Sequence, residues 1–371
     1  MKITKLETIH VKPRWLFLKV YTDEGIVGLG EPVVEGRAQT VEAAVREISR
    51  TLIGQDPRRI EHLWQTIYRG AFYRGGPVLT SALSGVEQAL WDITGKWLGV
   101  PVWQLLGGNT RDRIRVYGHF GGETVEAHIA SAKEAVARGF SALKTGPGGA
   151  WNIVDSWDKV QGFVDRFAAL RQALGEGIDI GVDFHGRISP AMSIRLCREL
   201  EPYHPFFVEE PCLPENVDTL VTIARSTTIP IATGERLFTK WGFREVLEKQ
   251  ACAIVQPDLS HAGGILEVKK IAAMAEAYFA AVAPHCPLGP IALAACLQVD
   301  ACVPNFLCQE QVNLGDGYLK EPFRVVDGYI ALPTRPGLGI ELDDMAIEDK
   351  VFSGDWETPA LRHLDGSVAD W

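Results

Sequence analysis

Residues 178–187 read IDIGVDFHGR, an apolar run of strand length that ends in an acidic residue and a histidine. Two stretches of the same kind follow at regular intervals, FFVEEP at 206–211 and ATGER at 232–236. The sequence between them has the apolar spacing of amphipathic helices. Short strands that alternate with helices predict a parallel sheet.

The same alternation extends from about Arg115 to about Leu297. The strand candidates are residues 114–117, 142–144, 178–183, 206–209, 231–233, 253–256, 280–283 and a weaker run at 305–308. Eight strands that alternate with helices favour a closed TIM-type (β/α) barrel over an open sheet.

The residues before the barrel predict an α+β domain. Three strand-like runs come first, at 3–9, at 17–21 and up to Gly30, and helical patterns follow at 40–52, 57–68 and 81–98. Gly99 and Pro101 are the expected stop signals of the last helix. We therefore divide the chain into a capping domain (1–113), a catalytic barrel (114–317) and a tail (318–371) that packs back on the capping domain.

Composition excludes several classes of protein. The 371 residues are 46% hydrophobic and 23% charged, as in an ordinary globular protein. The net charge is -10 without a long basic run, so no nucleic-acid partner is expected. No apolar run reaches the roughly 20 residues of a membrane span, and the first residues lack the apolar core of a secretory signal.

The seven cysteines form no CxxC pairs and are odd in number. They are expected to be reduced core thiols, which predicts a cytoplasmic location. Cys286 follows His285 and could be a nucleophile, but its apolar surroundings favour a packing role.

A polar residue follows nearly every predicted barrel strand. Barrel active sites are built at these carboxyl ends, so the side chains should converge on one mouth. The spacing supports this, since Asp183, Glu209 and Glu235 are each 26 residues apart (209 minus 183, 235 minus 209). The complete set is Lys144, Asp183, Glu209, Glu235, Asp258, His285 and Glu310.

Three neighbouring carboxylates repel one another unless a cation lies between them. Asp183, Glu209 and Glu235 offer only hard oxygen ligands, which favours one Mg²⁺ per subunit over zinc. Each could instead cap a helix or form an ordinary ion pair. Glu210 should face away, because adjacent strand residues point to opposite faces.

Two histidines are placed for proton transfer. His185 should face the same side as Asp183 if that strand stays extended. Asp258 and His285 end consecutive strands, where the carboxylate can orient the imidazole and raise its basicity. Asp258 could alternatively be a helix cap.

At this point the sequence resembles the enolase superfamily, in its mandelate-racemase-like branch, and is most similar to the D-galactonate dehydratases. The motifs that carry the resemblance span the chain: GVDFHGR, FFVEEP, ATGER, QPDLSHAGGI and APHCPLGPIALAA, supported by PRWLFLKVYTDEGIVGLGEP, FYRGGP, ALWDITGK and HLDGSVADW.

The resemblance implies a Mg²⁺-dependent hydro-lyase acting on an acid sugar. It implies that Asp183, Glu209 and Glu235 bind the metal and that His285, paired with Asp258, removes the C2 proton of an aldonate. His185 would protonate the departing C3 hydroxyl, Glu310 would stabilise the enolate, and the product would be a 2-keto-3-deoxy sugar acid. An epimerase or cycloisomerase using the same enolate is the alternative, and a non-catalytic binding protein is a third.

One position departs from the family. Residues 142–146 read Ala-Leu-Lys-Thr-Gly, where racemases of this branch carry a second lysine and galactonate dehydratases resemble Lys-x-Asn. Gly146 supplies neither base nor amide, which disfavours two-base racemisation. Lys144 is expected in the site, although it could be a surface cation.

Loops of the capping domain should contribute to substrate binding by closing over the barrel mouth. The candidates are Arg14, Trp15, Tyr73 and Arg74, for which interface or solvent packing is the alternative. A homo-oligomer is expected for the assembled protein.

Overall fold

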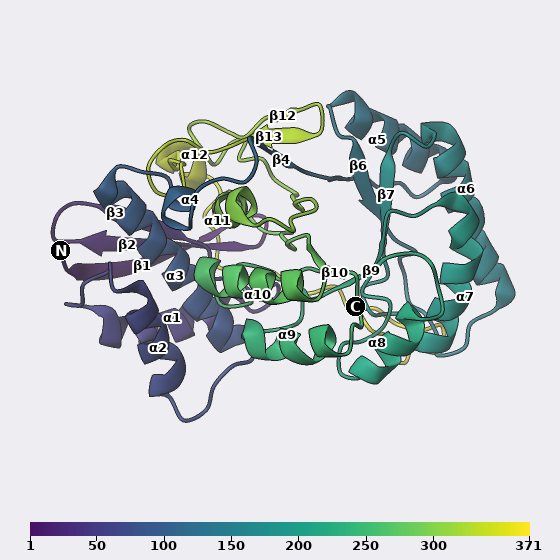
Figure 1. Ribbon diagram of the computed structural model, residues 1–371, viewed down its shortest axis with the longest axis horizontal. Coiled ribbons are helices and arrows are strands. Elements are labelled where there is room, and N and C mark those ends of the chain that lie inside the picture. Colours follow the sequence, from purple (N-terminus) through teal and green to yellow (C-terminus); the bar gives the residue numbers. More distant parts are fainter.

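An antiparallel sheet begins the chain (Figure 1). Its strands are β1 (Ile3–Val11), β2 (Trp15–Thr22) and β3 (Val27–Gly30), in that order. The computed structural model describes all residues 1–371. Four helices follow: α1 (Ala38–Leu52), α2 (Ile60–Gly70), α3 (Pro77–Leu98) and α4 (Val102–Leu105). As predicted, α3 stops at Gly99, which adopts the left-handed conformation with φ 72°.

Glycines let α3 approach the capping sheet closely. A β-carbon on Gly30 of β3 would collide with the backbone oxygen of Gly85 in α3. A β-carbon on Gly28 would collide with the backbone oxygen of Ala89 in the same way. These glycines therefore set the distance between helix and sheet.

The second sheet is parallel and curls into the barrel at the other end of the molecule (Figure 1). Its strands pair in sequence order. They are β5 (Gly118–His119), β6 (Ala142–Thr145), β7 (Asp179–Asp183), β8 (Val208–Glu209), β9 (Ile231–Thr233), β10 (Ile254–Val255) and β11 (Ala281–Val282).

Helices follow the barrel strands in turn. They are α5 (Val125–Ala137), α6 (Trp157–Leu174), α7 (Pro190–Leu200) with the short 3₁₀ helix η1 (Glu201–Tyr203), α8 (Val217–Ala224), α9 (Thr239–Glu248), α10 (Ile265–Ala277) and α11 (Pro290–Cys302). The expected architecture, a modified (β/α) barrel beside an α+β capping domain, is confirmed.

The eighth position of the barrel is held by single bridges. The run predicted at 305–308 lies there, with Phe306 bridged to Val282 and Gln309 bridged to Val116. Tyr117 N donates to Gln309 O at 3.1 Å, which closes the ring.

The first predicted barrel strand, residues 114–117, is divided: Val116 and Tyr117 pair with Gln309 in the barrel, but the residues before them pair with the tail. Arg113–Arg115 forms β4, which joins a small sheet with β12 (Val325–Val326) and β13 (Tyr329–Ala331) in the tail. Ile114 pairs with Ile330, and both are buried, so apolar contact with the tail accounts for the pairing. The first regular strand of the barrel is β5, which directly follows Tyr117.

The tail also contacts the capping sheet. Val351, beyond the short helix α12 (Asp344–Glu348), bridges to Val11 of β1, and Phe352 N donates to His10 O at 3.1 Å. The Arg14 guanidinium lies 5.1 Å from the ring centre of Trp356. The beginning and the end of the chain are thus packed together.

An apolar layer lies below the polar strand ends. Most members precede a polar residue of the same segment by two positions and so face the same way. The layer consists of Tyr117, Ala142, Phe207, Ala232, Ile254, Ala283 and Cys308. The seven cysteines are free, and no helix combines the length and apolar character required to cross a bilayer.

Candidate active site

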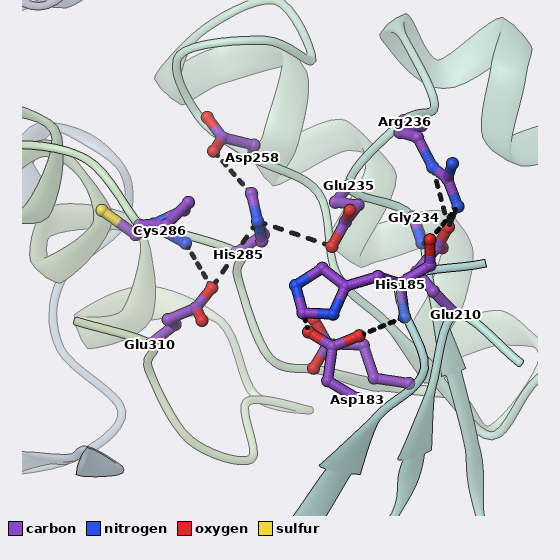
Figure 2. Close-up of polar contacts among 12 residues, drawn as sticks. Asp183, His185, Glu210, Gly234, Glu235, Arg236, Asp258, His285, Cys286 and Glu310 are labelled. Atoms are coloured by element: carbon purple, nitrogen blue, oxygen red, sulfur yellow. Dashed lines mark hydrogen bonds and ion pairs between the residues drawn. The ribbon is translucent and has the colours of Figure 1, made fainter. Parts of the chain in front are cut away.

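Three carboxylates meet at the carboxyl end of the barrel strands. Asp183 and Glu209 end the paired strands β7 and β8, and Glu235 follows β9 by two residues. One oxygen from each lies within 4.8 Å of the others. Figure 2 shows Asp183 and Glu235 facing the same space. Sequence spacing alone had placed all three at this mouth.

The charges of this cluster oppose one another. Burial, reinforced by Asp183, raises the pKa of Glu209 well above its ordinary value. Burial likewise raises the pKa of Glu235 to about 7. Glu209 Oε2 is buried and has no hydrogen-bond partner. An oxygen without a donor, beside two further carboxylates, fits a hard divalent cation.

Glu210 lies outside the cluster. It accepts hydrogen bonds from Thr233 Oγ1 at 2.5 Å and Gly234 N at 3.1 Å, and pairs with Arg236 Nη2 at 2.6 Å. The two glutamates of FFVEEP therefore have different roles: Glu209 faces the cluster, and Glu210 fixes the turn that presents Glu235.

His285 and Asp258 form the predicted pair. His285 Nδ1 lies 2.8 Å from Asp258 Oδ2, which leaves Nε2 toward the cluster, 3.5 Å from Glu235 and 3.8 Å from Glu310 (Figure 2). Burial lowers the pKa of His285, but Glu235, Glu310 and Asp258 outweigh it and raise that pKa well above its usual range. A cation on Glu235 would offset part of this effect.

His185 reaches the cluster by a different route from the one expected. The strand ends at Asp183, and His185 has a positive φ of 52° rather than an extended backbone. Its backbone N donates to Asp183 Oδ1 at 2.8 Å, which turns the chain back. His185 Nε2 then lies 3.3 Å from Asp183 Oδ2.

Lys144 is buried among the carboxylates, not on the surface. Its Nζ lies 2.8 Å from Glu209 Oε1, 2.8 Å from Glu310 Oε1 and 3.3 Å from Asp183 Oδ2. Burial disfavours its charge, but these carboxylates raise the pKa of Lys144 well above its usual value. Glu310 also accepts from Cys286 N at 2.9 Å. Contact with Cys296 lowers the pKa of Cys286, but burial and nearby carboxylates outweigh it and raise that pKa, which argues against a nucleophile.

A cavity of about 680 Å³ opens over these groups. Arg14 lines it and donates to Pro287 O at 3.2 Å. The other capping-domain candidates do not line it. Trp15 is 3% exposed, packed 4.9 Å from the Tyr318 ring, so it belongs to the domain core. Tyr73 and Arg74 lie on an exposed loop outside the cavity.

Sequence reasoning missed three groups near the pair. His119 Nε2 lies 2.9 Å from Glu310 Oε1, and it was missed because the first barrel strand was placed too early. His261 Nε2 lies 3.6 Å from Asp258 Oδ2 and 3.7 Å from Glu35 Oε2. His261 stands in the QPDLSHAGGI motif, three residues after Asp258, which was its available signal.

Comparison with known proteins adds relatives of full length. A D-galactonate dehydratase from Ralstonia nicotianae is 53% identical, and one from Cronobacter sakazakii is 52% identical. Each match covers 100% of both chains. The similarity therefore extends over the capping domain, the barrel and the tail alike.

Solved structures have the same fold. A mandelate racemase/muconate lactonizing enzyme from Sulfitobacter sp. superposes with TM-score 0.93 and 34% identity over 100% of both chains. One from Jannaschia sp. CCS1 gives TM-score 0.90 and 34% identity, covering 95% of this chain and 98% of the other.

Two family models divide the sequence much as the fold does. Residues 4–107 match the mandelate racemase/muconate lactonizing enzyme N-terminal domain, and residues 127–346 match the enolase C-terminal domain-like family. Together with the superpositions, these matches confirm the resemblance seen in the motifs. The chain belongs to the mandelate racemase/muconate lactonizing enzyme family of the enolase superfamily.

Proposed function

We propose that this protein is a Mg²⁺-dependent acid-sugar dehydratase, a hydro-lyase that converts an aldonate to a 2-keto-3-deoxy sugar acid. The observation that carries the proposal is the pair of histidines beside the carboxylate cluster. His285 Nε2 lies 3.5 Å from Glu235, and His185 Nε2 lies 3.3 Å from Asp183. Elimination requires a base and an acid at one site, and this arrangement offers both.

Asp183, Glu209 and Glu235 would hold the metal. When bound, Mg²⁺ supplies positive charge that stabilises the negative charge developing on a substrate carboxylate. The unpaired Glu209 Oε2 supports this assignment. Lys144 Nζ pairs with Glu209 Oε1, so Glu209 Oε2 is the oxygen that can bind the ion.

His285 would act as the base through Nε2. Asp258 binds Nδ1 and so fixes the tautomer in which Nε2 accepts the proton from C2. As that C–H bond breaks, its electron pair passes into the enolate. Glu310, held by Lys144 and Cys286 N, lies beside His285 and would face the developing negative oxygen. Burial raises the pKa of Glu310, but Lys144 and His285 outweigh it and lower that pKa well below its usual range. A proton shared with the oxygen would therefore have to come from a neighbour such as His119, whose Nε2 lies 2.9 Å from Glu310 Oε1.

His185 would act as the acid. It would donate a proton from Nε2 to the C3 hydroxyl, whose C–O bond breaks to release water. Burial lowers the pKa of His185, so a proton held there is readily given up. The enol product takes up a proton from solvent at C3 and releases its hydroxyl proton as it becomes the 2-keto acid, so the overall change is the loss of one water.

The test is a panel of C5 and C6 acid sugars, galactonate included because the relatives bear that name. With Mg²⁺, we expect a 2-keto acid from at least one compound, no product after chelation, and full recovery when Mg²⁺ is restored. Glu209→Gln should weaken Mg²⁺ binding more than about tenfold, and the exposed control Glu215→Gln should not.

Two results would contradict the proposal. Turnover that persists after complete chelation would remove the metal from the reaction. Deuterium exchange at C2 without loss of the hydroxyl group, across the whole panel, would indicate an epimerase instead.

A further inference from the structure

One cation in the cavity wall has no negative partner. Arg14 lies 4.0 Å from Glu35, Arg236 lies 2.6 Å from Glu210, and Lys144 contacts three carboxylates. Arg166 is the remaining cationic side chain that lines the cavity, and it forms no ion pair within 4.0 Å. Its charge is therefore uncompensated within the protein.

The surroundings of Arg166 satisfy only part of its hydrogen-bonding capacity. It projects from α6, and its Nη2 donates to Gly146 O at 3.0 Å and Pro147 O at 3.2 Å. Its Nε is buried without an acceptor. Burial alone acts on the pKa of Arg166 and lowers it. The guanidinium nevertheless stays charged at neutral pH. A partly desolvated cation of this kind is stabilised by a bound anion.

A second unpaired group lies on the same wall. His128 of α5 is 6% exposed, and its Nε2 lies 3.0 Å from Thr145 Oγ1. Its Nδ1 is buried without a partner. Burial and the nearby Arg166 charge lower the pKa of His128, so the ring is neutral and offers one donor and one acceptor.

This wall lies next to the carboxylate cluster along β6. Lys144 contacts Glu209, Thr145 contacts His128, and Gly146 accepts from Arg166. Three consecutive residues thus connect the cluster to the unpaired cation. A sugar acid whose first carboxylate is bound at the cluster can extend along β6 toward Arg166.

Gly146 is required for this arrangement. A β-carbon there would collide with the backbone oxygen of Asp183, so the chain passes too close for any side chain. Glycine at this position therefore allows residue 146 to lie against the backbone of Asp183 while its own carbonyl oxygen accepts from Arg166.

We propose that Arg166, His128 and Thr145 form an anion-binding subsite for the far end of the substrate. The preferred acid sugar then carries a second anionic group there, as a hexarate does and a hexonate does not. A terminal hydroxyl would leave the Arg166 charge unmatched, whereas a carboxylate or phosphate compensates it. This inference rests on the proposed function, because it requires that the first carboxylate bind at the cluster.

The experiment compares kcat/KM for three compounds of one configuration: a hexonate, the matching hexarate and the 6-phosphohexonate. We expect the native enzyme to prefer the hexarate or the 6-phosphohexonate to the hexonate. Comparison of these two compounds shows whether the subsite binds a carboxylate or a phosphate. Arg166→Met should lower the ratio of dianion to hexonate kcat/KM about 10- to 100-fold, since a charged hydrogen bond is lost. Arg166→Lys should recover part of that ratio.

A matched control is Arg198→Met, an exposed arginine on α7 outside the cavity, which should keep the native ratio. The subsite is refuted if the hexonate is the best substrate of the native enzyme, or if Arg166→Met keeps the native ratio. If either result is obtained and the enzyme still dehydrates the hexonate, only the subsite is refuted and the proposed dehydratase function stands. Failure of all acid sugars would instead count against the proposed function itself.

Discussion

Lys144 shows how a single buried charge orders the site. Its Nζ contacts Asp183, Glu209 and Glu310, three carboxylates that would otherwise repel one another. One positive charge cannot balance these groups and Glu235 when all four are ionised, so their ionisation leaves excess negative charge at the barrel mouth. That excess favours binding of a divalent cation.

Replacing His285 by asparagine should remove the base while preserving the shape of the site. We expect kcat to fall by about 10²- to 10⁴-fold, the usual contribution of general base catalysis. Mg²⁺ affinity, measured by titration calorimetry, should stay close to native, because the three carboxylates are unchanged. The exposed His62 provides the control His62→Asn. Unchanged kcat in His285→Asn would show that another group removes the proton.

Introducing the family's asparagine at position 146 should impair this enzyme instead of improving it. The new β-carbon would meet the backbone oxygen of Asp183, and either the loop or the metal ligand must move. We expect Gly146→Asn to lower Mg²⁺ affinity more than about tenfold, by analogy with loss of the groups that orient a ligand. Gly177→Asn is the control, because a β-carbon on Gly177 meets nothing within 4 Å. Native affinity in Gly146→Asn would mean that the loop yields easily.

The groups predicted well at this scale were those that end barrel strands. Asp183, Glu209, Glu235 and the Asp258–His285 pair follow from strand spacing and the alternation of side chains. Glu35 comes from a loop of the other domain, and Arg166 comes from the middle of a helix. The place of Glu35 depends on packing between the domains, and that of Arg166 depends on how α6 packs beside β6. Spacing along the chain encodes neither.

At the scale of elements, the close contact between β3 and α3 is possible because glycines, which have no side chain, lie where the two elements meet. Gly85→Ala should destabilise the protein, since the added methyl group would collide with Pro32. Overpacking of this kind costs about 1–3 kcal/mol in unfolding free energy. The control, Gly162→Ala in α6, has open space around its β-carbon and should stabilise the helix by about 0.5–1 kcal/mol. Equal stability of the two variants in urea unfolding would contradict the close packing.

The strands that were predicted least well are those with the least regular pairing. Strands β6 to β11 were found near their true positions because apolar runs and polar ends mark each of them. The run at 114–117 is divided, since its first residues pair with the tail and its last two pair with Gln309 in the barrel. An apolar run predicts that a strand forms, but it does not specify the partner.

At the scale of the molecule, Glu87 joins the two domains. It lies in α3 of the capping domain and accepts from Ile265 N at 2.7 Å and Leu266 N at 2.9 Å, at the start of barrel helix α10. Trp91 Nε1 also donates to it at 2.7 Å. A helix N-terminus of the barrel is therefore capped by a side chain from the other domain.

This junction should make stability depend on pH. Burial raises the pKa of Glu87 from 4.5 to about 7, so the folded state keeps a proton that the unfolded chain has lost. The contribution of Glu87 to the unfolding free energy should fall as pH rises from about 4.5 to about 7, by about 1.4 kcal/mol per pKa unit, and then level off.

The measurement is urea unfolding of native protein and Glu87→Gln across this pH range. The native value minus the Glu87→Gln value should decline with rising pH. For the exposed control Glu215→Gln the corresponding difference should stay flat. A flat difference for Glu87→Gln would show that the carboxyl is ionised throughout.

The homo-oligomer expected from sequence is not tested by any of these measurements and stays a prediction.

The small sheet of β12, β13 and β4 has a consequence for synthesis of the chain. Arg115 pairs with Tyr329, a separation of 214 residues (329 minus 115). During synthesis, β4 cannot pair until β13, more than 200 residues later, has emerged from the ribosome. Nascent intermediates therefore keep this edge unpaired, and we expect a slow final step governed by long-range closure.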